Sequence, residues 1–480
     1  MKLRELLHGV DTVQIHADLE QEIAAVAYDS RAVQPGGMFV AVAGFASDGN
    51  RFIPMAMEKG AAVIVTASVP SLPVPYVQVA SDRLALAQIS ANWFGHPAEK
   101  MIMVGVTGTN GKTSVTLLLK HVLETVLHAK VGLIGTMSNW IGACELPTQR
   151  TTPESYELQS LFARMQQAGC QYVVMEVSSH ALALDRVGGV KYSVGAFTNL
   201  TEDHLDFHKT MEAYCDAKAI LFSRCAKCVM NQDDPWFGRM KESAVGEVLT
   251  TSAEATAGLY AADIALLPDG VRYRAVYGNQ SAQVCLPIPG RFSVYNSLTV
   301  LGLALELGVD LEAAAAALKT ARGVKGRVEV VPTPGKDFTV LIDYAHTPDG
   351  LENVLSTVRG FCKGRLIAVF GCGGDRDPMK RPIMARIGVR LADFAILTSD
   401  NPRSEDPEAI LADMCRGLTG ENWEIVPDRR AAIRRAMDMA KQGDIVVLAG
   451  KGHETYQEIQ GVKRHLDERE EVAAHLKEME

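Results

Sequence analysis

The sequence has no hydrophobic run that could cross a membrane, because no stretch reaches the roughly 18 uninterrupted apolar residues that a spanning helix needs. It also has no excess of basic charge. The formal net charge is −9, so a nucleic-acid partner is not expected. The N-terminal segment MKLRELLHGV is too short and too charged for a signal peptide, so we expect neither export nor a membrane partner.

Cysteines are few and show no regular spacing. The chain has nine of them, an odd number, which predicts free thiols in the reducing cytoplasm. The one close pair is Cys225 and Cys228 in CAKC, a spacing found in redox sites and in half of a zinc site. No second Cys-x-x-Cys pair completes a zinc site in the sequence, so we expect both thiols to be buried and inert.

Length and hydrophobic pattern predict an α/β protein of several domains. A chain of 480 residues, 47% hydrophobic and 22% charged, is typical of a globular protein too long for a single core. From residue 101, apolar strands alternate with helical stretches, the pattern of a parallel sheet with crossover helices. Residues 258–290 carry short alternating runs and predict a small antiparallel patch, and a second strand–helix alternation follows GVKGRVEVV at 323–331.

Changes in composition suggest three domains. We place a mixed α/β domain at 1–98, ending in the linker GHPAEK, a central P-loop domain with a parallel sheet at 99–328, and a Rossmann-like, doubly wound domain at 329–480. The predicted strands of the last domain end in polar or glycine-rich residues. In an open α/β sheet, that edge is where ligands bind.

The segment VGVTGTNGKTSVTLLL, residues 104–119, nearly matches a phosphate-binding loop. Val106 stands where the usual pattern has its first glycine, and a glycine occupies position 108 instead. Glycines let backbone N–H groups approach phosphate oxygens, Lys112 would reach the β- and γ-phosphates, and the Thr113 hydroxyl would bind Mg²⁺. A plain strand-to-helix turn does not need Gly-Lys-Thr at the helix start, so we predict a phosphate site.

The loop TGTNGKTS resembles that of the Mur ligase family, whose members use ATP to add amino acids to the peptidoglycan precursor. Further segments resemble other family motifs, in family order and over nearly the whole chain: MEVSSHAL (175–182), FTNLTEDHLDFH (197–208), YCDAKAILF (214–222), RFSVYNSLTVLG (291–302), KGRVEVV (325–331) and LIDYAHTPDGL (341–351). The resemblance implies ATP and Mg²⁺ as cofactors, and we expect a cytoplasmic monomer.

The resemblance implies metal ligation by Thr113, Glu176, His204 and Lys218. Lys112, Lys218 and His204 are the implied catalytic residues, and carbamylation would turn the Lys218 cation into an anionic oxygen ligand for a second Mg²⁺. The residues alone leave other interpretations open. They are a salt bridge or cap for Glu176, a surface or core histidine for His204, and a solvated helix face for Lys218.

Nucleotide contacts are implied in several segments. They are Gly108, Thr109, Asn110, Gly111, Lys112, Thr113 and Ser114 in the loop, Asn296 at adenine, Asp343 at the ribose, and Arg327 and His346 facing the nucleotide. For His346, a capping or core role is the alternative.

The resemblance also implies the substrate UDP-N-acetylmuramoyl-L-alanyl-D-glutamate. Its implied contacts are Ser30 in YDSR, Thr151, Thr152, Ser178 and Arg186. Phe45-Ala46 stands where many relatives have His-Gln, so we expect different side-chain contacts in that loop. Leu184 stands where some relatives have Gln, and we expect one hydrogen bond fewer there.

The segment SDNPRSEDP (399–407) indicates the second substrate. Asp400, Asn401, Pro402 and Arg403 match the signature of family members that add meso-2,6-diaminopimelate, and Arg376, Gly450 and Glu454 are further implied contacts. An arginine can fork onto the second carboxylate of this amino acid. The implied reaction forms an amide at the γ-carboxylate of D-glutamate through an acyl phosphate.

Other functions fit parts of the sequence. One is a lysine-adding member of the same family, for which the SDNPR segment would be only a turn with a surface arginine. A second is a folylpolyglutamate synthase, against which Thr113-Ser114 and the YDSR segment argue. A third is a noncatalytic nucleotide-binding switch, which would need Lys112 but no set of metal-binding carboxylate, histidine and lysine.

Overall fold

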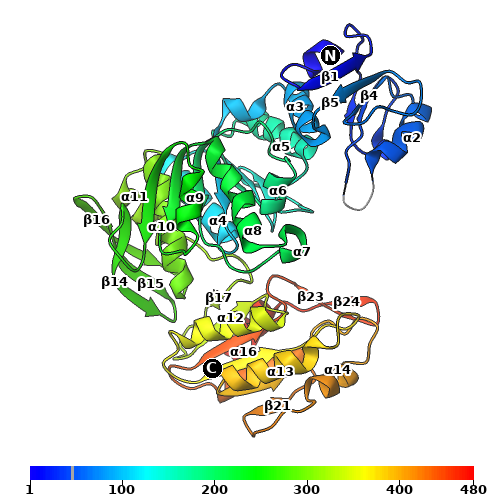
Figure 1. Ribbon diagram of the computed structural model, residues 1–480. Helices are drawn as coiled ribbons and strands as arrows, with labels where there is room; N and C mark the ends of the chain where they lie inside the picture. Colours follow the sequence, from blue (N-terminus) through cyan, green and yellow to red (C-terminus); the bar gives the residue numbers. More distant parts are fainter. Residues whose placement is uncertain (45–47, 480) are drawn as a thin grey trace. The chain divides into compact units, whose positions relative to one another are not determined.

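The computed structural model describes residues 1–44 and 48–479 (Figure 1). The chain divides into two units, Met1–Tyr260 with Leu298–Ala314 and Ala261–Ser297 with Ala315–Glu480. Among the described residues, no helix has the length and apolar character needed to cross a bilayer. The pair Phe45-Ala46, where the chain departs from the family pattern, lies outside the described residues.

The first sheet of the first unit has the strand order β1-β5-β4-β3-β2. Its strands are β1 (Thr12–His16), β2 (Val26–Ala27), β3 (Met38–Val40), β4 (Val63–Thr66) and β5 (Tyr76–Val79). Successive residues of a strand face opposite sides, so Val65 packs in one core with helix α3 (Asp82–Phe94) and Ile64 packs in another. The predicted linker is a 3₁₀ turn, Pro97–Lys100, that leads directly into the next sheet.

A parallel sheet forms the centre of the first unit, as predicted. Its strands run in the order β13-β12-β11-β6-β10-β7. They are β6 (Ile102–Thr107), β7 (Val131–Ile134), β10 (Tyr172–Glu176), β11 (Tyr192–Phe197), β12 (Cys225–Asn231) and β13 (Glu247–Ser252). Two antiparallel strands, β8 (Asn139–Ile141) and β9 (Cys144–Leu146), follow β7. Because β6 lies between β11 and β10 and all three strands are parallel, the loop after β6 lies beside the carboxyl ends of those two strands.

Helices cover this sheet. Helix α4 (Lys112–Leu127) packs on β6, β7 and β10, and helix α5 (Ser155–Gln167) shares a core with β10. The shorter helices are α6 (Ser179–Ala183), α7 (Leu205–His208), α8 (Met211–Ala219) and α9 (Phe237–Glu242). Cys225 and Cys228 lie buried in β12, in agreement with the expected burial.

The predicted antiparallel patch is present. Strands β15 (Gly270–Tyr277) and β16 (Gln280–Leu286) pair antiparallel after β14 (Leu259–Leu267). Helices α10 (Arg291–Glu306) and α11 (Leu311–Leu318) follow.

The C-terminal sheet is doubly wound, with the order β17-β18-β22-β19-β20-β21. Its strands are β17 (Glu329–Val331), β18 (Thr339–Asp343), β19 (Leu366–Phe370), β20 (Phe394–Leu397), β21 (Trp423–Ile425) and β22 (Ile445–Ala449). Only β17 runs antiparallel to its neighbour among these described strands. The hairpin β23 (Tyr456–Ile459) and β24 (Val462–His465) follows β22.

Both faces of this sheet are covered by helices (Figure 1). Val447 of β22 packs in the core that includes helices α12 (Pro348–Arg359) and α13 (Lys380–Leu391), whereas Val446 packs with α15 (Arg429–Met439) and α16 (Glu468–Glu478). Helix α14 (Pro407–Met414) joins the first of these cores. This alternation explains the nearly continuous apolar runs in the sequence.

The chain enters this sheet through a tightly packed turn. Gly326 has φ +73°, and a Cβ there would lie 2.4 Å from backbone atoms of Gly452 and His453. Its N–H donates to Glu329, at 2.6 Å, and Glu329 pairs with Arg469 of α16. The turn is therefore fixed to the loop that follows β22.

A buried ion pair joins α15 to α16. The Arg429 and Glu468 side chains are both 0% exposed, and Arg429 Nε donates to Glu468 Oε1 at 2.8 Å. Arg429 Nη2 also donates to the carbonyl of Ala449, at 2.8 Å, where β22 ends. Removing one member of such a pair leaves an uncompensated buried charge, while replacing both can be nearly neutral.

We therefore expect Arg429→Met to destabilise the C-terminal sheet by about 3–5 kcal/mol, and the double variant Arg429→Met/Glu468→Met to recover most of that loss. Hydrogen exchange of peptides from β22 is the measurement, because it follows this sheet by itself. Exchange should be fast in the single variant and close to wild type in the double variant. A double variant that exchanges as fast as the single one would contradict this account.

Candidate functional site

The glycine loop owes its shifted pattern to steric demands at two positions. Gly108 has φ +146°, and a Cβ there would lie 1.9 Å from the Thr198 hydroxyl oxygen. Gly111 has φ +86° and is the residue from which helix α4 begins. Val106, by contrast, is a fully buried residue inside β6 and has no need to be glycine. The loop is also tied to the end of β11, since the Asn110 N–H donates to Asn199 Oδ1 at 2.9 Å.

Two lysines approach this loop. Lys112 Nζ donates to the carbonyls of Gly108 and Thr109, both at 2.8 Å, and Lys218 Nζ donates to the same Gly108 carbonyl at 2.8 Å. Burial lowers the pKa of Lys112. Burial, and then the nearby Lys112 cation, hold the pKa of Lys218 well below its ordinary value. Lys218 is 1% exposed, so the alternative of a solvated helix face for it is wrong.

Glu176 ends β10 beside the start of α4. Its Oε1 accepts hydrogen bonds from the Thr113 hydroxyl and the Thr136 N–H, each at 2.9 Å, and its Oε2 accepts one from the Thr136 hydroxyl at 2.9 Å. The residue is 1% exposed. All these donors are neutral, so the buried carboxylate has hydrogen bonds but no direct cationic partner among the described residues. Carboxylate and hydroxyl oxygens next to a phosphate loop suit Mg²⁺.

His204 lies near Lys218 without joining Glu176. Its ring is 4.8 Å from that of His180 and 6.1 Å from that of Tyr214, and Lys218 Nζ lies 4.5 Å from the centre of the Tyr214 ring. The His204 side chain is 46% exposed, with Nε2 3.4 Å from Asp203 Oδ2. Within residues 1–44 and 48–479, no three His, Cys, Asp or Glu side chains converge as metal ligands. Ligation of a second metal by His204 and Lys218 therefore stays a prediction.

The residues predicted to contact the UDP-substrate fall into two places. Thr152 Oγ1 donates to the Glu176 carbonyl at 2.9 Å and accepts from the Ser178 N–H at 3.1 Å. Thr151 Oγ1 lies 3.0 Å from the Thr136 hydroxyl. Thr151 is therefore linked to the Glu176 carboxylate through Thr136, while Thr152 and Ser178 lie at the backbone of Glu176. Ser30 lies elsewhere, in a cleft of about 650 Å³.

A group of arginines beside this cleft escaped the sequence reasoning. The Glu154 carboxylate lies 2.9 Å from Arg150, 2.9 Å from Arg186 and 3.7 Å from Arg83. Arg186 was a predicted substrate contact, whereas Arg83 and Glu154 were not. Three cations around one anion leave a local positive excess that favours anionic ligands. The sequence held one signal of this arginine group, since Arg150 directly precedes the predicted substrate contact Thr151.

On the C-terminal sheet, Asp343 is held by the backbone. Its two carboxylate oxygens accept the N–H groups of Val328 and Ala345, each at 2.8 Å, and burial raises the pKa of the carboxyl group. His346 Nδ1 lies 2.8 Å from the Tyr344 carbonyl, and the Arg327 guanidinium lies 5.6 Å from the centre of the Tyr344 ring. Arg327, Asp343 and His346 therefore lie together at the end of β18. Asn296 is buried in α10.

The SDNPR segment follows β20 and meets the loop after β22. Asn401 Nδ2 donates to Glu454 Oε2 at 2.8 Å. Gly450 has φ +118°, and a Cβ there would lie 2.5 Å from Asp400 Oδ2. Arg403, after Pro402, has φ +52° and donates from Nη1 to the Gly374 carbonyl at 2.7 Å. The structure thus brings six of the seven residues predicted for diaminopimelate binding to one edge of the sheet.

Arg376 is exposed, and its one hydrogen bond among the described residues goes to the adjacent Asp375 carbonyl, at 3.4 Å. It is therefore free to turn toward a ligand, and its predicted role stays a prediction. Lys451, which the sequence reasoning passed over, is buried among the residues of this edge.

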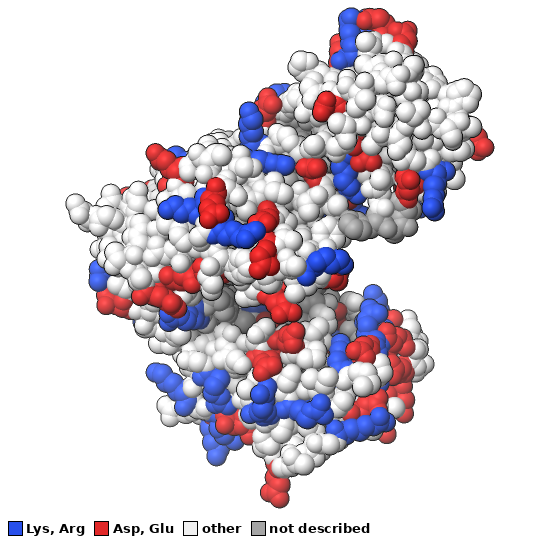
Figure 2. All heavy atoms as spheres, viewed as in Figure 1, with Lys and Arg blue, Asp and Glu red and all other residues white. Residues whose placement is uncertain are grey.

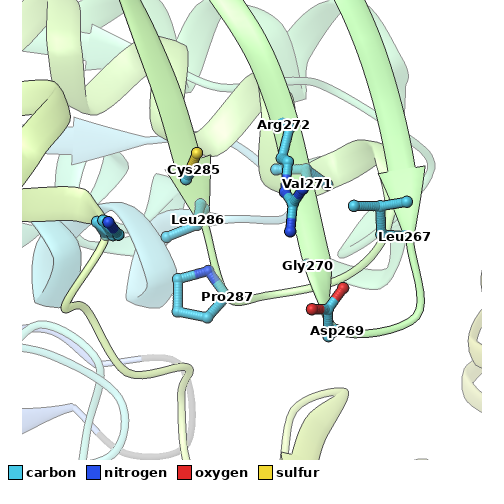
Figure 3. A pocket seen from close by; sticks show the side chains of 9 residues that line it. Leu267, Asp269, Gly270, Val271, Arg272, Cys285, Leu286 and Pro287 are labelled. Atoms are coloured by element: carbon cyan, nitrogen blue, oxygen red, sulfur yellow. The ribbon is translucent and has the colours of Figure 1, made fainter.

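A separate hollow of about 110 Å³ lies at the turn between β14 and β15 (Figure 3). Asp269, Arg272 and Lys319 line it together with apolar residues, and none of the predicted site residues does. On the face shown in Figure 2, acidic and basic side chains are interspersed, with no continuous basic surface.

Comparison with known proteins places these features in a family. Three family models match: the catalytic domain of the Mur ligase family at residues 22–94, the Mur ligase middle domain at 106–304, and the Mur ligase, glutamate ligase domain at 326–452.

Whole-chain relatives agree with these matches. The UDP-N-acetylmuramoyl-L-alanyl-D-glutamate–2,6-diaminopimelate ligase 1 of Clostridium acetobutylicum is 46% identical, covering 100% of both chains. A solved UDP-N-acetylmuramoyl-L-alanyl-D-glutamate–2,6-diaminopimelate ligase is 32% identical with a TM-score of 0.79, covering 100% of this chain and 99% of that one. The MurF ligase of Thermotoga maritima in complex with ADP shares the fold, at 17% identity and a TM-score of 0.59, covering 95% of this chain and 98% of that one. The chain therefore belongs to the Mur ligase family.

Proposed function

We propose that the protein is an ATP-dependent ligase that joins meso-2,6-diaminopimelate to the D-glutamate γ-carboxylate of UDP-N-acetylmuramoyl-L-alanyl-D-glutamate, with release of ADP and phosphate. The observation that carries the proposal is the pairing of a complete phosphate loop with the Asp400–Arg403 segment, in a chain that matches ligases of this name from end to end. We assign residues 1–98 to the UDP-substrate, 99–328 to ATP and 329–480 to the amino acid.

The residues around the loop act on the phosphates. Backbone N–H groups after Gly108 would cradle them, and Lys112, now turned onto loop carbonyls, would exchange those contacts for phosphate oxygens. Thr113 and Glu176 would hold Mg²⁺, which would offset the charge of the phosphates. The geometry fits this role. The Thr113 hydroxyl already lies 2.9 Å from the Glu176 carboxylate, and that carboxylate has no direct cationic partner among the described residues.

The chemistry then needs mainly positioning. Thr151, Thr152, Ser178 and Arg186 would hold the peptide end of the UDP-substrate beside Glu176. A γ-carboxylate oxygen attacks the γ-phosphorus and ADP leaves. The amine of the amino acid next attacks the resulting acyl phosphate and phosphate leaves. Because side chains form no covalent bond in these steps, holding the reactants together and neutralising charge account for the rate.

The edge formed by Asp400, Asn401, Arg403 and Glu454 would select the amino acid. Diaminopimelate carries a second ammonium and a second carboxylate at its far end, whereas lysine carries only an ammonium there. Arg403 suits that carboxylate, and the acidic side chains suit the ammonium. Lysine would leave the guanidinium without its anion.

Lys112→Ala and Glu176→Ala should each lower the ligation rate by about 10²-fold or more, because each variant removes a preorganised charge beside the phosphates. The measurement is ADP release in the presence of both substrates. Lys120→Ala is the matched control, since Lys120 lies on the same helix but pairs with Glu124 at 2.6 Å. Near-normal rates in either site variant, with folding intact, would refute the assignment.

Lys218 should carry a carbamate. Its lowered pKa supplies the neutral amine that reacts with CO₂, and the resulting anion would attract Lys112 where a second cation would repel it. ¹³C NMR of unacidified protein in labelled bicarbonate should show a carbamate signal that Lys218→Ala lacks and that the exposed-residue control Lys191→Ala keeps. Lys218→Ala should also be nearly inactive and partly rescued by short carboxylic acids. A native protein with only the free amine would count against this modification.

Diaminopimelate should be preferred over lysine by at least ~30-fold in kcat/KM, since ~1.4 kcal/mol corresponds to tenfold and an unpaired charge partner costs more than that. Arg403→Ala should lose most of the preference, whereas Arg416→Ala, at a side chain that is 77% exposed, should keep it. Parallel kinetics with the two amino acids decide the matter. Equal or better use of lysine would overturn the choice of amino acid and leave the ligase assignment intact.

A further inference from the structure

Lys451 is wholly buried two residues after the end of β22. Its side chain is 0% exposed, and Nζ donates to Asn401 Oδ1 at 3.0 Å and to Glu454 Oε2 at 3.1 Å. The same nitrogen lies 3.9 Å from Asp400 Oδ1. Lys451 thus contacts three residues of the proposed amino-acid site while its own ammonium is closed off from solvent.

These contacts fix how the Asn401 amide is turned. Its oxygen accepts both from Lys451 Nζ and from the Glu458 N–H, which lies at 2.9 Å. The amide nitrogen must therefore face the other way, where it donates to Glu454 Oε2 at 2.8 Å. Lys451, Asn401 and Glu454 close a ring of hydrogen bonds in which each side chain orients the next.

The ring also sets the charge of the site. The Asp400 and Glu454 side chains are only 8% and 15% exposed, so two carboxylates here repel each other in a poorly hydrated environment. One buried ammonium offsets one of those charges and leaves the other. No described residue donates a hydrogen bond to the second Glu454 oxygen, Oε1. Glu454 Oε1 is therefore the oxygen of this group that is left to receive the ammonium of the substrate.

We propose that Lys451 is a positioning residue for the amino-acid substrate: it holds Glu454 and Asn401 in the orientation that receives the ammonium at the far end of the amino acid. This inference rests on the proposed ligase function. Lys451 does not touch the substrate, because its ammonium is already enclosed by protein oxygens. Its effect passes through Glu454 and Asn401.

The test is a comparison of Michaelis constants. In Lys451→Met, which keeps an unbranched stem of similar length but has no charge, KM for the amino acid that the wild type accepts should rise at least tenfold. KM for ATP and for the UDP-substrate should stay within twofold. Arg365→Met is the matched control. Arg365 pairs with Asp444 at 2.7 Å at the opposite end of the same strands, so its loss should leave all three constants unchanged.

If Lys451→Met does not fold because Glu454 is left unpaired, the double variant Lys451→Met/Glu454→Gln removes that charge and is compared with Glu454→Gln alone. The double variant should have the higher KM for the amino acid, because Asn401 also loses the Lys451 contact that orients it. A uniform change in all three constants, or an unchanged KM for the amino acid, would overturn the inference while wild-type ligation continued to support the proposed function. A wild type that ligates neither diaminopimelate nor lysine would remove the proposed function and this inference together.

Discussion

One hydrogen bond, from the Thr113 hydroxyl to the Glu176 carboxylate, joins the first turn of α4 to the end of β10 and organises the first unit around it. A buried carboxylate is costly unless it is hydrogen-bonded or paired, and here Thr136 supplies two further donors. Thr152 then binds the carbonyl of the same residue. The first turn of α4, the segment after β7 and the predicted peptide contact Thr152 thus all meet at one residue, Glu176, at a strand end.

Much of this arrangement could be predicted because parallel strands bring their carboxyl ends to one edge. The phosphate loop, Glu176 and the SDNPR segment each follow an apolar run, so their places were readable from the sequence, as was the doubly wound C-terminal sheet. The glycine shift has a local cause as well. Position 106 lies inside a strand, whereas position 108 touches Thr198.

The features that sequence reasoning missed depend on contacts between distant segments. Glu154 gathers Arg83 and Arg186, which lie on separate elements, and no spacing rule connects them. Burial of a lysine is equally hidden, since α8 has a short and weakly patterned sequence that fits a solvated face for Lys218. Lys218 and Lys451 are both buried. Lys218 contacts a carbonyl and lies near the Lys112 cation, whereas Lys451 lies beside carboxylates. The same residue type therefore has opposite electrostatic surroundings in the two units.

The contact between Gly326 and the backbone of Gly452 limits how this protein can change during evolution. Two main chains touch there without an intervening side chain, so Gly326 cannot be exchanged without separating the entry turn from the loop that carries Glu454, and a Cβ at Gly452 would lie 2.5 Å from the Tyr344 side chain. Arg469 reinforces the contact by donating to the Gly452 carbonyl at 3.0 Å. Insertions or new chain termini are better accommodated at Gly335, where nothing lies within 4 Å of an added Cβ. At the entrance to this sheet, we therefore expect changes in sequence to be tolerated around Gly335 and not at Gly326.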